Sequence, residues 1–420
     1  MATATTKKDI RVYADWQGLA TPVLMGVLNA TSAKGKETFS FEYAAAWIQS
    51  GFSQMIDPDL QLFSGAYYPR DDKQNFGIFL DSCPDRWGRV LMQRREAAIA
   101  KKEERHPKKL AESDFLLGVY DGHRMGALRF KLEDAGVFLN DNAAMASPPW
   151  TSLRELEQAS LKFEEDNTDD PKYLKWINLL IAPGSSLGGA RPKASVMDAK
   201  NNLWIAKFPS KNDDKDIAAW EMVTHELAIK AGVNIAEAKL QQFNNRYHTF
   251  ITKRFDRNAK GQRIHFASAM TLLGHKDGED AAGASYLELA EFIIRHGAAV
   301  EKDLEELWRR IVFSIAVKNT DDHLRNHGFL LTGKGWTLSP AYDINPNEYG
   351  KGLSLNISDT DNSLDLDLAL EVAGLFRIDD KKANKIIKQV TIAVSDWKKI
   401  AAKYKISKAE QDRMAAAFEL

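Results

Sequence analysis

The chain contains one cysteine, Cys83, among 420 residues. A single cysteine cannot form an internal disulfide, which fits a protein kept in a reducing compartment. The chain also lacks an excess of either charge, since its 57 Lys and Arg residues and 58 Asp and Glu residues give a net charge of −1. No overall positive field would therefore draw the chain to nucleic acid, and a stand-alone DNA-binding protein is not expected.

Long apolar runs are absent as well. No segment approaches the roughly 20 consecutive apolar residues that cross a bilayer, and Met1–Lys8 lacks the apolar core of a secretory signal. We therefore expect a cytoplasmic protein with no membrane partner. With 44% hydrophobic and 27% charged residues, the composition is that of a globular protein with enough apolar material for two or three domains or lobes.

The periodicity of the apolar residues changes along the chain. Alternating and β-branched segments at 10–16 and 22–28 predict strands in the first third, whereas helical spacing prevails from residue 266 onward. The helices expected there cover 286–294, 304–317, 365–375, 382–392 and 407–418. Polar segments at 139–148 and 165–171 are the loop candidates that divide the chain. The predicted fold class is α+β.

The strongest chemical signal is the sequence Asn-Thr-Asp-Asp-His-Leu-Arg-Asn at 319–326, which follows the buried helix expected at 304–317. Asp321 and Asn326 have the D-x-x-x-x-N spacing that protein kinases use for a catalytic base and a metal-binding amide. A hairpin predicted at 328–338 would return the chain so that Asp343 faces the same point as Asn326. Oxygen ligands of this kind suit Mg²⁺ bound together with phosphate.

Two neighbours of Asp321 have simpler explanations. Asp and Asn often cap helices or bond their own backbone in turns, and we expect such a structural role for Asp322. His323 is expected to fix the loop by hydrogen bonding, although an imidazole could also ligate a metal or orient Asp321. Trp336 and Tyr342 are expected to pack the hairpin.

A second signal is the glycine-rich segment 184–193, Gly-Ser-Ser-Leu-Gly-Gly-Ala-Arg-Pro-Lys. It is not a Walker A sequence, and a lone glycine-rich loop is often only a turn, but its backbone amides could cradle phosphate. Strands predicted at 194–196 and 203–208 strengthen the nucleotide interpretation, because Lys207 then lies on a strand after the glycine loop, as in a kinase. Glu221, on the helix predicted at 217–231, either pairs with Lys207 or is simply exposed.

In combination these motifs resemble the HipA-type serine/threonine kinase toxins. Residues 319–326 followed by Ser339–Asp343 resemble that family's catalytic and metal motifs, and 184–193 resembles its phosphate loop with an autophosphorylated serine. The resemblance extends to Lys253–Arg257, which borders the nucleotide in the family, and to two amino-terminal segments, Pro84–Arg89 and Arg124–Leu128. Each motif is short, but their order along most of the chain makes the resemblance specific.

The resemblance implies a two-lobed, protein-kinase-like fold with a strand-rich amino-terminal region and a helical carboxy-terminal lobe. Residues 1–138 would form the amino-terminal subdomain of the family. Residues 139–258 would form the β-rich, nucleotide-binding part with the phosphate loop. Residues 259–420 would form the helical lobe that carries the catalytic and metal-binding loop.

The resemblance also assigns roles for phosphoryl transfer from ATP, with Mg²⁺, to a serine or threonine hydroxyl. Asp321 is the expected catalytic residue, and Ser186 is the expected site of autophosphorylation, with Ser185 as the alternative. The residues expected to bind nucleotide or metal are Ser186, Gly188, Gly189, Lys207, Lys253, Phe255, Asn326 and Asp343, of which Asn326 and Asp343 hold the metal.

Partners follow from the resemblance alone. It implies a growth-inhibiting toxin of a type II toxin–antitoxin system, bound by a HipB-like helix-turn-helix antitoxin that links it indirectly to operator DNA. An aminoacyl-tRNA synthetase is one known type of substrate, but Arg191–Pro192 departs from some members and no target is assigned. Three alternatives stay open: a small-molecule or lipid kinase, a catalytically silent antitoxin-binding corepressor, and, as a weaker option, a metal-dependent hydrolase using Asp321, Asp322 and His323.

Overall fold

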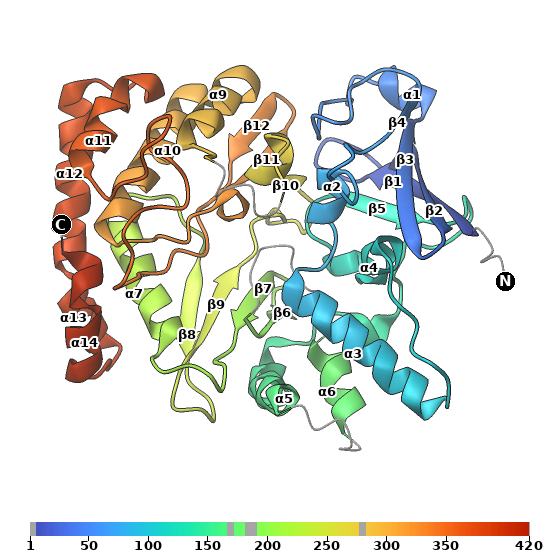
Figure 1. Ribbon diagram of the computed structural model, residues 1–420, viewed down its shortest axis with the longest axis horizontal. Helices are drawn as coiled ribbons and strands as arrows, with labels where there is room; N and C mark the ends of the chain where they lie inside the picture. Colours follow the sequence, from blue (N-terminus) through green and yellow to red (C-terminus); the bar gives the residue numbers. More distant parts are fainter. Residues whose placement is uncertain (1–5, 166–171, 181–190, 277–282, 420) are drawn as a thin grey trace. The chain divides into compact units, whose positions relative to one another are not determined.

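The computed structural model describes residues 6–165, 172–180, 191–276 and 283–419 (Figure 1). The chain divides into two compact units. The first comprises Met1–Ala206 with Asp256–Ala267, and the second comprises Lys207–Phe255 with Ser268–Leu420. Both contain helices and strands, which confirms the α+β class. The family-type division at residues 138 and 258 stays a prediction.

The first unit is built on a five-stranded antiparallel sheet with the order β4-β3-β2-β1-β5. The strands are β1 (Thr6–Ala14), β2 (Val23–Ala33), β3 (Lys36–Tyr43), β4 (Ala66–Tyr67) and β5 (Leu128–Lys131). Burial alternates along β1 and β3, so that residues such as Val12 and Phe41 face the core while their neighbours do not. The two strands expected near the start of the chain are confirmed.

A two-residue turn joins β2 to β3. Lys34 and Gly35 both have positive φ, +50° and +77°, which is the requirement of a type I′ hairpin. This turn sets the register, with Ala33 opposite Lys36 and the pairing running on to Gly26 opposite Tyr43.

Helices and a strand pair complete the first unit. They are α1 (Ala45–Ile48), α2 (Gly77–Asp81), α3 (Arg86–Lys102), α4 (Glu112–Gly118), α5 (Leu153–Glu164), α6 (Tyr173–Leu180), β6 (Lys193–Met197) and β7 (Leu203–Lys207). Short 3₁₀ turns cover Asp121–His123, Ala143–Met145 and Trp150–Ser152. The strands expected at 194–196 and 203–208 are therefore confirmed.

The two amino-terminal motifs that resemble the kinase toxins have structural roles in this unit. Asp85 caps α3 by accepting the Gly88 N–H at 2.8 Å, and its other oxygen lies 2.8 Å from the buried Lys193 ammonium. Arg124 is fully buried and donates to four backbone carbonyls, those of Ser82, Leu116, Val119 and Leu139. These four bonds tie distant loops together, and they satisfy the Nη1 and Nη2 donors of a guanidinium that is costly to bury.

The second unit is mainly helical. Its helices are α7 (Ile217–Lys230), α8 (Ala269–Leu272), α9 (Tyr286–His296), α10 (Val300–Ala316), α11 (Leu366–Glu371), α12 (Asp380–Ser395), α13 (Trp397–Lys403) and α14 (Lys408–Met414), with 3₁₀ turns at Leu324–Asn326, Ala373–Phe376 and Ala415–Phe418. Two antiparallel pairs accompany them, β8 (Ala238–Gln241) with β9 (Thr249–Lys253), and β11 (Gly328–Thr332) with β12 (Gly335–Leu338). Strand β10 (Phe266–Ser268) lies where the chain passes between the units. Helices thus predominate over 259–420, and the predicted hairpin at 328–338 is confirmed within it.

Helix α10 forms the centre of the second unit. Its buried residues Leu304, Trp308 and Ile311 recur at helical spacing and pack among α9, α11 and α12 (Figure 1). The Trp308 indole N–H donates to the Ala369 carbonyl at 2.9 Å, so its one polar atom is satisfied in the core. Within the part of the chain that the structure describes, no helix has the length and apolar character needed to cross a membrane.

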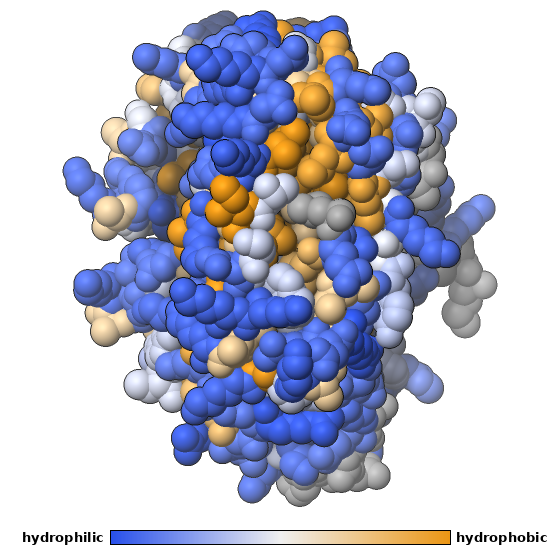
Figure 2. Space-filling model, turned by 90° about the vertical axis from the view of Figure 1, so that its left-hand side faces the viewer, coloured by the Kyte–Doolittle hydropathy of each residue, from blue (hydrophilic) through white to orange (hydrophobic). Residues whose placement is uncertain are grey.

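The surface of the second unit around α12 to α14 is largely hydrophilic but includes a patch of hydrophobic residues (Figure 2). Leu375 and Ile392 are among the large apolar side chains that this unit exposes, at 57% and 61% of their surface. Single exposed apolar residues are normal, whereas a contiguous patch is typical of contact surfaces.

Candidate active site

The loop after α10 carries Asp321 and Asn326. Lys318 takes a left-handed conformation, φ +47°, and turns the chain out of the helix. Asn319 is buried and donates its backbone N–H to the Ser314 carbonyl at 2.8 Å. Its side-chain oxygen accepts the Asn345 backbone N–H at 3.1 Å. Asn319 therefore fastens the catalytic loop to the segment that follows the hairpin.

Asp321 and Asn326 are joined through the backbone. The Asn326 Nδ2 donates to the Asp321 carbonyl at 2.7 Å, and this closes the loop. The Asn326 Oδ1 is buried and has no protein donor. The Asp321 side chain keeps 88% of its surface exposed. The loop thus presents one exposed carboxylate and one buried amide oxygen without a protein donor, and an ion or a water is one explanation for such an oxygen.

The pKa of the Asp321 carboxyl is raised above its ordinary value. Partial desolvation in the loop is the first cause, and the negative charges of Asp343 and Asp322 add to it. His323 acts in the opposite direction, with its Nε2 4.0 Å from the Asp321 Oδ1. A higher pKa makes this carboxylate a stronger proton acceptor.

Asp322 has the structural role expected of it. It is buried, and its Oδ2 accepts the Tyr286 hydroxyl at 2.5 Å and the Ser314 hydroxyl at 3.2 Å. The His327 Nε2 lies 3.1 Å from the Oδ1. Burial works against the charged carboxylate, but His327 and the hydrogen bonds outweigh it and lower the pKa of Asp322. These contacts hold the loop from beneath while Asp321 points outward.

Lys207 brings a positive charge to the site. It lies at the end of β7, and its ammonium is 2.6 Å from the Glu221 Oε1 and 2.7 Å from the Asp343 Oδ1. Burial opposes the charged ammonium, but the two carboxylates outweigh it and raise the pKa of Lys207. The predicted pairing of Lys207 with Glu221 on α7 is confirmed. The structure also shows that the Lys207 ammonium contacts Asp343, which the sequence did not predict.

Asp343 and Asn345 follow the hairpin together. Asp343 has φ +58°, a left-handed conformation that Asp and Asn adopt more readily than other non-glycine residues. The Asn345 Nδ2 donates to the Asp343 Oδ1 at 3.1 Å, while the Asn345 Oδ1 is buried without a protein donor. Sequence reasoning missed Asn345. The available signal was the sequence Asp-Ile-Asn, in which two polar residues after the hairpin are separated by one apolar residue.

The oxygen atoms of this site fit a hard cation. Asn326 and Asn345 each contribute an unsatisfied buried amide oxygen, and Asp343 contributes a carboxylate. Mg²⁺ takes oxygen ligands, usually one or two carboxylates with phosphate oxygens and water. Across the described ranges, no group of three His, Cys, Asp or Glu side chains is placed to hold a metal. A metal here would therefore depend on amide oxygens and on the phosphates of a nucleotide.

The hairpin and its neighbours fix the position of Asp343. Strands β11 and β12 pair with Phe329 opposite Leu338 and Thr332 opposite Gly335. Beyond β12, the Tyr342 hydroxyl donates to the Arg325 carbonyl at 2.7 Å. The hairpin thus brings the residue before Asp343 back to the residue before Asn326.

The remaining predicted binding residues fall into two groups. Phe255 is half-buried with its ring 5.6 Å from that of Tyr342, and Lys253 is partly exposed with its Nζ 3.8 Å from the Glu237 carboxylate. Their contact with a nucleotide stays a prediction. Ser185, Ser186, Gly188 and Gly189 lie outside the described residues.

Comparison with known proteins shows the family of the chain. The protein-family model of the HipA-like C-terminal domain matches residues 185–397, which are just over half of the chain. The matched range includes Lys207, Asp321, Asn326 and Asp343. The chain belongs to the HipA family.

Individual relatives of the family are distant. A serine/threonine-protein kinase toxin HipA from Shewanella oneidensis is 25% identical over 262 residues, covering 54% of this chain and 58% of that protein. A Haemophilus influenzae protein named "Putative kinase" is 27% identical over 180 residues, 38% of this chain and 52% of that protein. The chain thus matches just over half the length of these curated relatives.

A solved structure shows that the HipA fold extends over nearly the whole chain. It is the Shewanella oneidensis HipA in a complex with HipB and operator DNA, with a TM-score of 0.63 over 97% of this chain and 94% of that one. The sequence identity is 19%, so the match shows the fold and not the activity. The predicted kinase-like α+β fold is confirmed.

Proposed function

We propose that this HipA-family chain is an ATP- and Mg²⁺-dependent serine/threonine protein kinase that acts as the toxin of a type II toxin–antitoxin system. One observation carries the proposal: the Lys207 ammonium is held between Glu221 and Asp343 at 2.6 and 2.7 Å. Protein kinases use a strand lysine paired with a helix glutamate to hold phosphate, and an aspartate to hold the metal.

The proposed reaction transfers the γ-phosphoryl group of ATP to a serine or threonine hydroxyl. Asp321 accepts the hydroxyl proton as the oxygen attacks phosphorus, and ADP leaves with the electron pair of the broken bond. Lys207 neutralises phosphate oxygens. Asn326, Asp343 and Asn345 are the residues that would hold Mg²⁺, which when bound supplies further positive charge against the phosphates. Positioning and charge compensation provide most of the rate.

The exposed Asp321 supports a macromolecular acceptor. Its side chain is 88% exposed, so a hydroxyl on a protein loop can reach it without opening the fold. We include autophosphorylation of Ser186, with Ser185 as the alternative, in the proposal. A phosphate added to a glycine-rich phosphate loop would repel the phosphates of ATP. The enzyme would then switch itself off.

The proposed partners come from the family. The Shewanella oneidensis relative forms a complex with HipB and operator DNA. We propose a HipB-like antitoxin for this chain, with operator DNA contacted through it, and a cytoplasmic protein substrate, an aminoacyl-tRNA synthetase being one candidate class.

Two alternatives differ in how well they fit. A kinase for a small molecule or lipid would use the same residues, and it differs from the proposed protein kinase only in the molecule that accepts the phosphoryl group. The metal-dependent hydrolase fits poorly, since the Asp322 carboxylate already accepts the Tyr286 hydroxyl and the described residues offer no three-ligand cluster.

The test is intact mass and peptide mapping after incubation of dephosphorylated, ATP-binding protein with Mg²⁺ and ATP. We expect phosphate on the peptide that contains Ser185 and Ser186 in the wild type, and none in Asp321→Asn or Asp343→Asn. Phosphate transferred only to metabolites would favour the small-molecule kinase. If the wild type binds ATP and transfers phosphate to no acceptor, the catalytically silent corepressor becomes the better explanation.

A further inference from the structure

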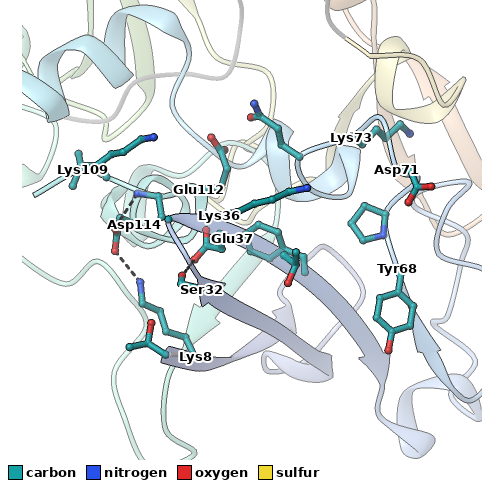
Figure 3. A pocket seen from close by; sticks show the side chains of 18 of the residues that line it. Lys8, Ser32, Lys36, Glu37, Tyr68, Asp71, Lys73, Lys109, Glu112 and Asp114 are labelled. Atoms are coloured by element: carbon teal, nitrogen blue, oxygen red, sulfur yellow. Dashed lines mark hydrogen bonds and ion pairs between the residues drawn. The ribbon is translucent and has the colours of Figure 1, made fainter. Parts of the chain in front are cut away.

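The first unit contains a groove far in sequence from the kinase residues, with a volume of about 990 Å³. Clefts that bind ligands measure roughly 300–1,000 Å³, so this groove is at the upper end of that range. Its floor is the first half of β3, and its two walls are residues 68–74 and 108–114. Figure 3 shows Lys36 and Glu37 between Lys109 and Asp114 on one side and Tyr68 and Asp71 on the other.

The floor of the groove is an open strand edge. β3 pairs with β2 over its whole length, but β4 pairs only with Phe41 and Glu42. The type I′ turn makes Ala33 and Lys36 a hydrogen-bonded pair. In an antiparallel ladder such pairs alternate with pairs that are not hydrogen-bonded to each other. The N–H and C=O groups of Glu37 and Phe39 therefore point away from β2. Within the described residues, no backbone group forms a hydrogen bond with these outward-facing N–H and C=O groups.

Pro69 explains why β4 ends where it does. With Tyr67 opposite Phe41, a longer β4 would bring Pro69 opposite Phe39, and proline has no N–H for the ladder. The chain leaves the sheet at Tyr68 and becomes the wall of the groove. This wall is anchored, since the Lys73 ammonium lies 2.7 Å from the Asp59 carboxylate and is almost fully buried. The intact fold therefore leaves this edge open.

The opposite wall is fastened to the floor. The Glu37 carboxylate accepts the backbone N–H of Ser113 at 2.9 Å and its hydroxyl at 2.6 Å. The Lys8 ammonium lies 2.8 Å from both the Ser113 hydroxyl and the Asp114 carboxylate. Both walls thus keep their distance from the strand edge without help from a ligand, which lowers the ordering cost of binding.

The positive charges that remain available are unevenly placed. Lys8, Lys73 and Lys108 have carboxylate partners. Lys36, at the start of β3, and Lys109, on the neighbouring wall, are exposed and have no partner in the described part of the chain. The groove therefore offers two unpaired cations at the end where β3 begins. An acidic segment complements them.

We propose that this groove binds an extended, acidic peptide segment of a partner protein, which adds to the sheet as a strand antiparallel to β3. Its backbone bonds the free groups of Glu37 and Phe39, as in other cases of strand addition at a sheet edge. An antiparallel strand has its carboxyl end beside Lys36, so the acidic residues lie at the carboxyl end of the segment. The site works independently of phosphoryl transfer.

The experiment uses the full chain and a labelled octapeptide of alternating Val and Thr with Asp at its last two positions. Its control has the same composition with the two Asp residues at the amino end. We expect the carboxyl-acidic peptide to bind about tenfold more tightly, the size that two exposed charge contacts supply. Hydrogen exchange should slow at Glu37 and Phe39, whose N–H groups point away from β2, when this peptide is bound.

Two charge variants test the cations. Lys36→Glu combined with Lys109→Glu should weaken the carboxyl-acidic peptide by about tenfold or more. Lys102→Glu, an exposed change on α3 outside the groove, should leave its affinity within about twofold. Unchanged thermal melting shows that the variants fold, and the hydrogen-exchange measurement on the wild type needs no variant.

Each contrary result overturns the proposal. The first is that no binding is detected at about 1 mM peptide, a concentration at which weak specific binding is still measurable. The second is that the two peptides bind equally well, and the third is that a peptide binds without protecting β3 from hydrogen exchange. The fourth is that inorganic phosphate displaces the peptide completely. The last would identify a simple anion site at Lys36 and Lys109.

Discussion

Lys207 and Asp343 are 136 positions apart in the sequence, and their ammonium and carboxylate lie 2.7 Å apart in the fold. Glu221 shares the same ammonium from α7. The side chains of Lys207 and Glu221 retain 13% and 6% of their exposure, so the cluster is largely withdrawn from water. A charge cluster of this kind costs desolvation and is stable only while every member has its partner. The cluster therefore couples the fold of the second unit to the chemistry proposed for it.

Replacing Lys207 by Met should remove activity and stability together. Two carboxylates would lose their shared cation, and breaking a buried pair from one side costs about 3 kcal/mol or more. We expect a lower denaturation midpoint in urea and no detectable phosphoryl transfer. The double variant Lys207→Met with Glu221→Gln should regain part of the stability and none of the activity. Recovery of activity in that double variant would show that Lys207 does not hold phosphate.

Asn345 should contribute to binding of the divalent cation. Asn345→Ala removes a buried oxygen and the N–H donor to Asp343, and loss of such a group weakens metal binding by about tenfold or more. Mn²⁺ affinity in the presence of a non-hydrolysable ATP analogue can be measured by electron paramagnetic resonance, without any turnover. Asn347→Ala is the matched control, because the Asn347 side chain bonds Thr320 instead. Equal Mn²⁺ affinity in the two variants would assign Asn345 a purely structural role.

Tyr286 supports the catalytic loop through Asp322. Tyr286→Phe deletes the hydroxyl that donates to the buried Asp322 Oδ2, which should cost about 1–3 kcal/mol. Because the loop rather than the nucleotide site loses its support, we expect kcat to fall and the KM for ATP to stay constant. Tyr68→Phe, at a side chain that is 70% exposed, should change neither quantity. A rise in KM for ATP without a change in kcat would contradict this role.

The acid limb of the activity profile should move when His323 is changed. The charge interaction with His323 lowers the pKa of the Asp321 carboxyl, and His323→Gln removes that interaction. The already raised pKa of Asp321 then rises further. Since the base must be deprotonated to accept the hydroxyl proton, activity should be lost at a higher pH in the variant as the solution is acidified. The autophosphorylation rate against pH measures this, and an acid limb that stays in place or moves to lower pH would exclude the proposed interaction.

Local patterns predicted much of the fold and part of the site. The periodic residues of α10, the turn between β11 and β12, and the strand carrying Lys207 depend on neighbours in sequence, and all three were expected. The contact of Lys207 with Asp343 was not expected, because nothing local specifies which distant carboxylate an ammonium meets. The roles of Asn319 and Asn345 were missed for the same reason, since an Asn in a turn usually bonds its own backbone.

The open edge of β3 shows another limit of sequence reasoning. Alternation predicts strands but not which strand is at the edge or how far its neighbour extends. Here the decisive residue is Pro69, whose effect depends on the register of Tyr67 against Phe41. Register of this kind becomes visible only once both strands are placed.

Asp57 should make the stability of the first unit depend on pH. It is fully buried, and its oxygens accept the N–H groups of Asp59 at 2.9 Å and Ile78 at 3.0 Å. Desolvation is the main cause that raises the pKa of its carboxyl from 3.8 to about 6. The folded state thus binds a proton more tightly than the unfolded chain, so the stabilisation is fully present below pH 4 and is lost as the pH rises through about 6. A shift of this size corresponds to roughly 2–3 kcal/mol.

The variant Asp57→Asn isolates that contribution. The amide keeps an oxygen for one of the two backbone N–H groups and has no proton to lose, so its unfolding free energy should vary less between pH 4 and 6 than that of the wild type. Urea denaturation of both proteins across this range measures the difference. Asp71→Asn, at an exposed carboxylate of the groove wall, should leave the wild-type slope unchanged. If Asp57→Asn keeps the full wild-type slope, the pH dependence arises from other carboxyl groups, because only a titrating Asp57 can lose its contribution on this substitution.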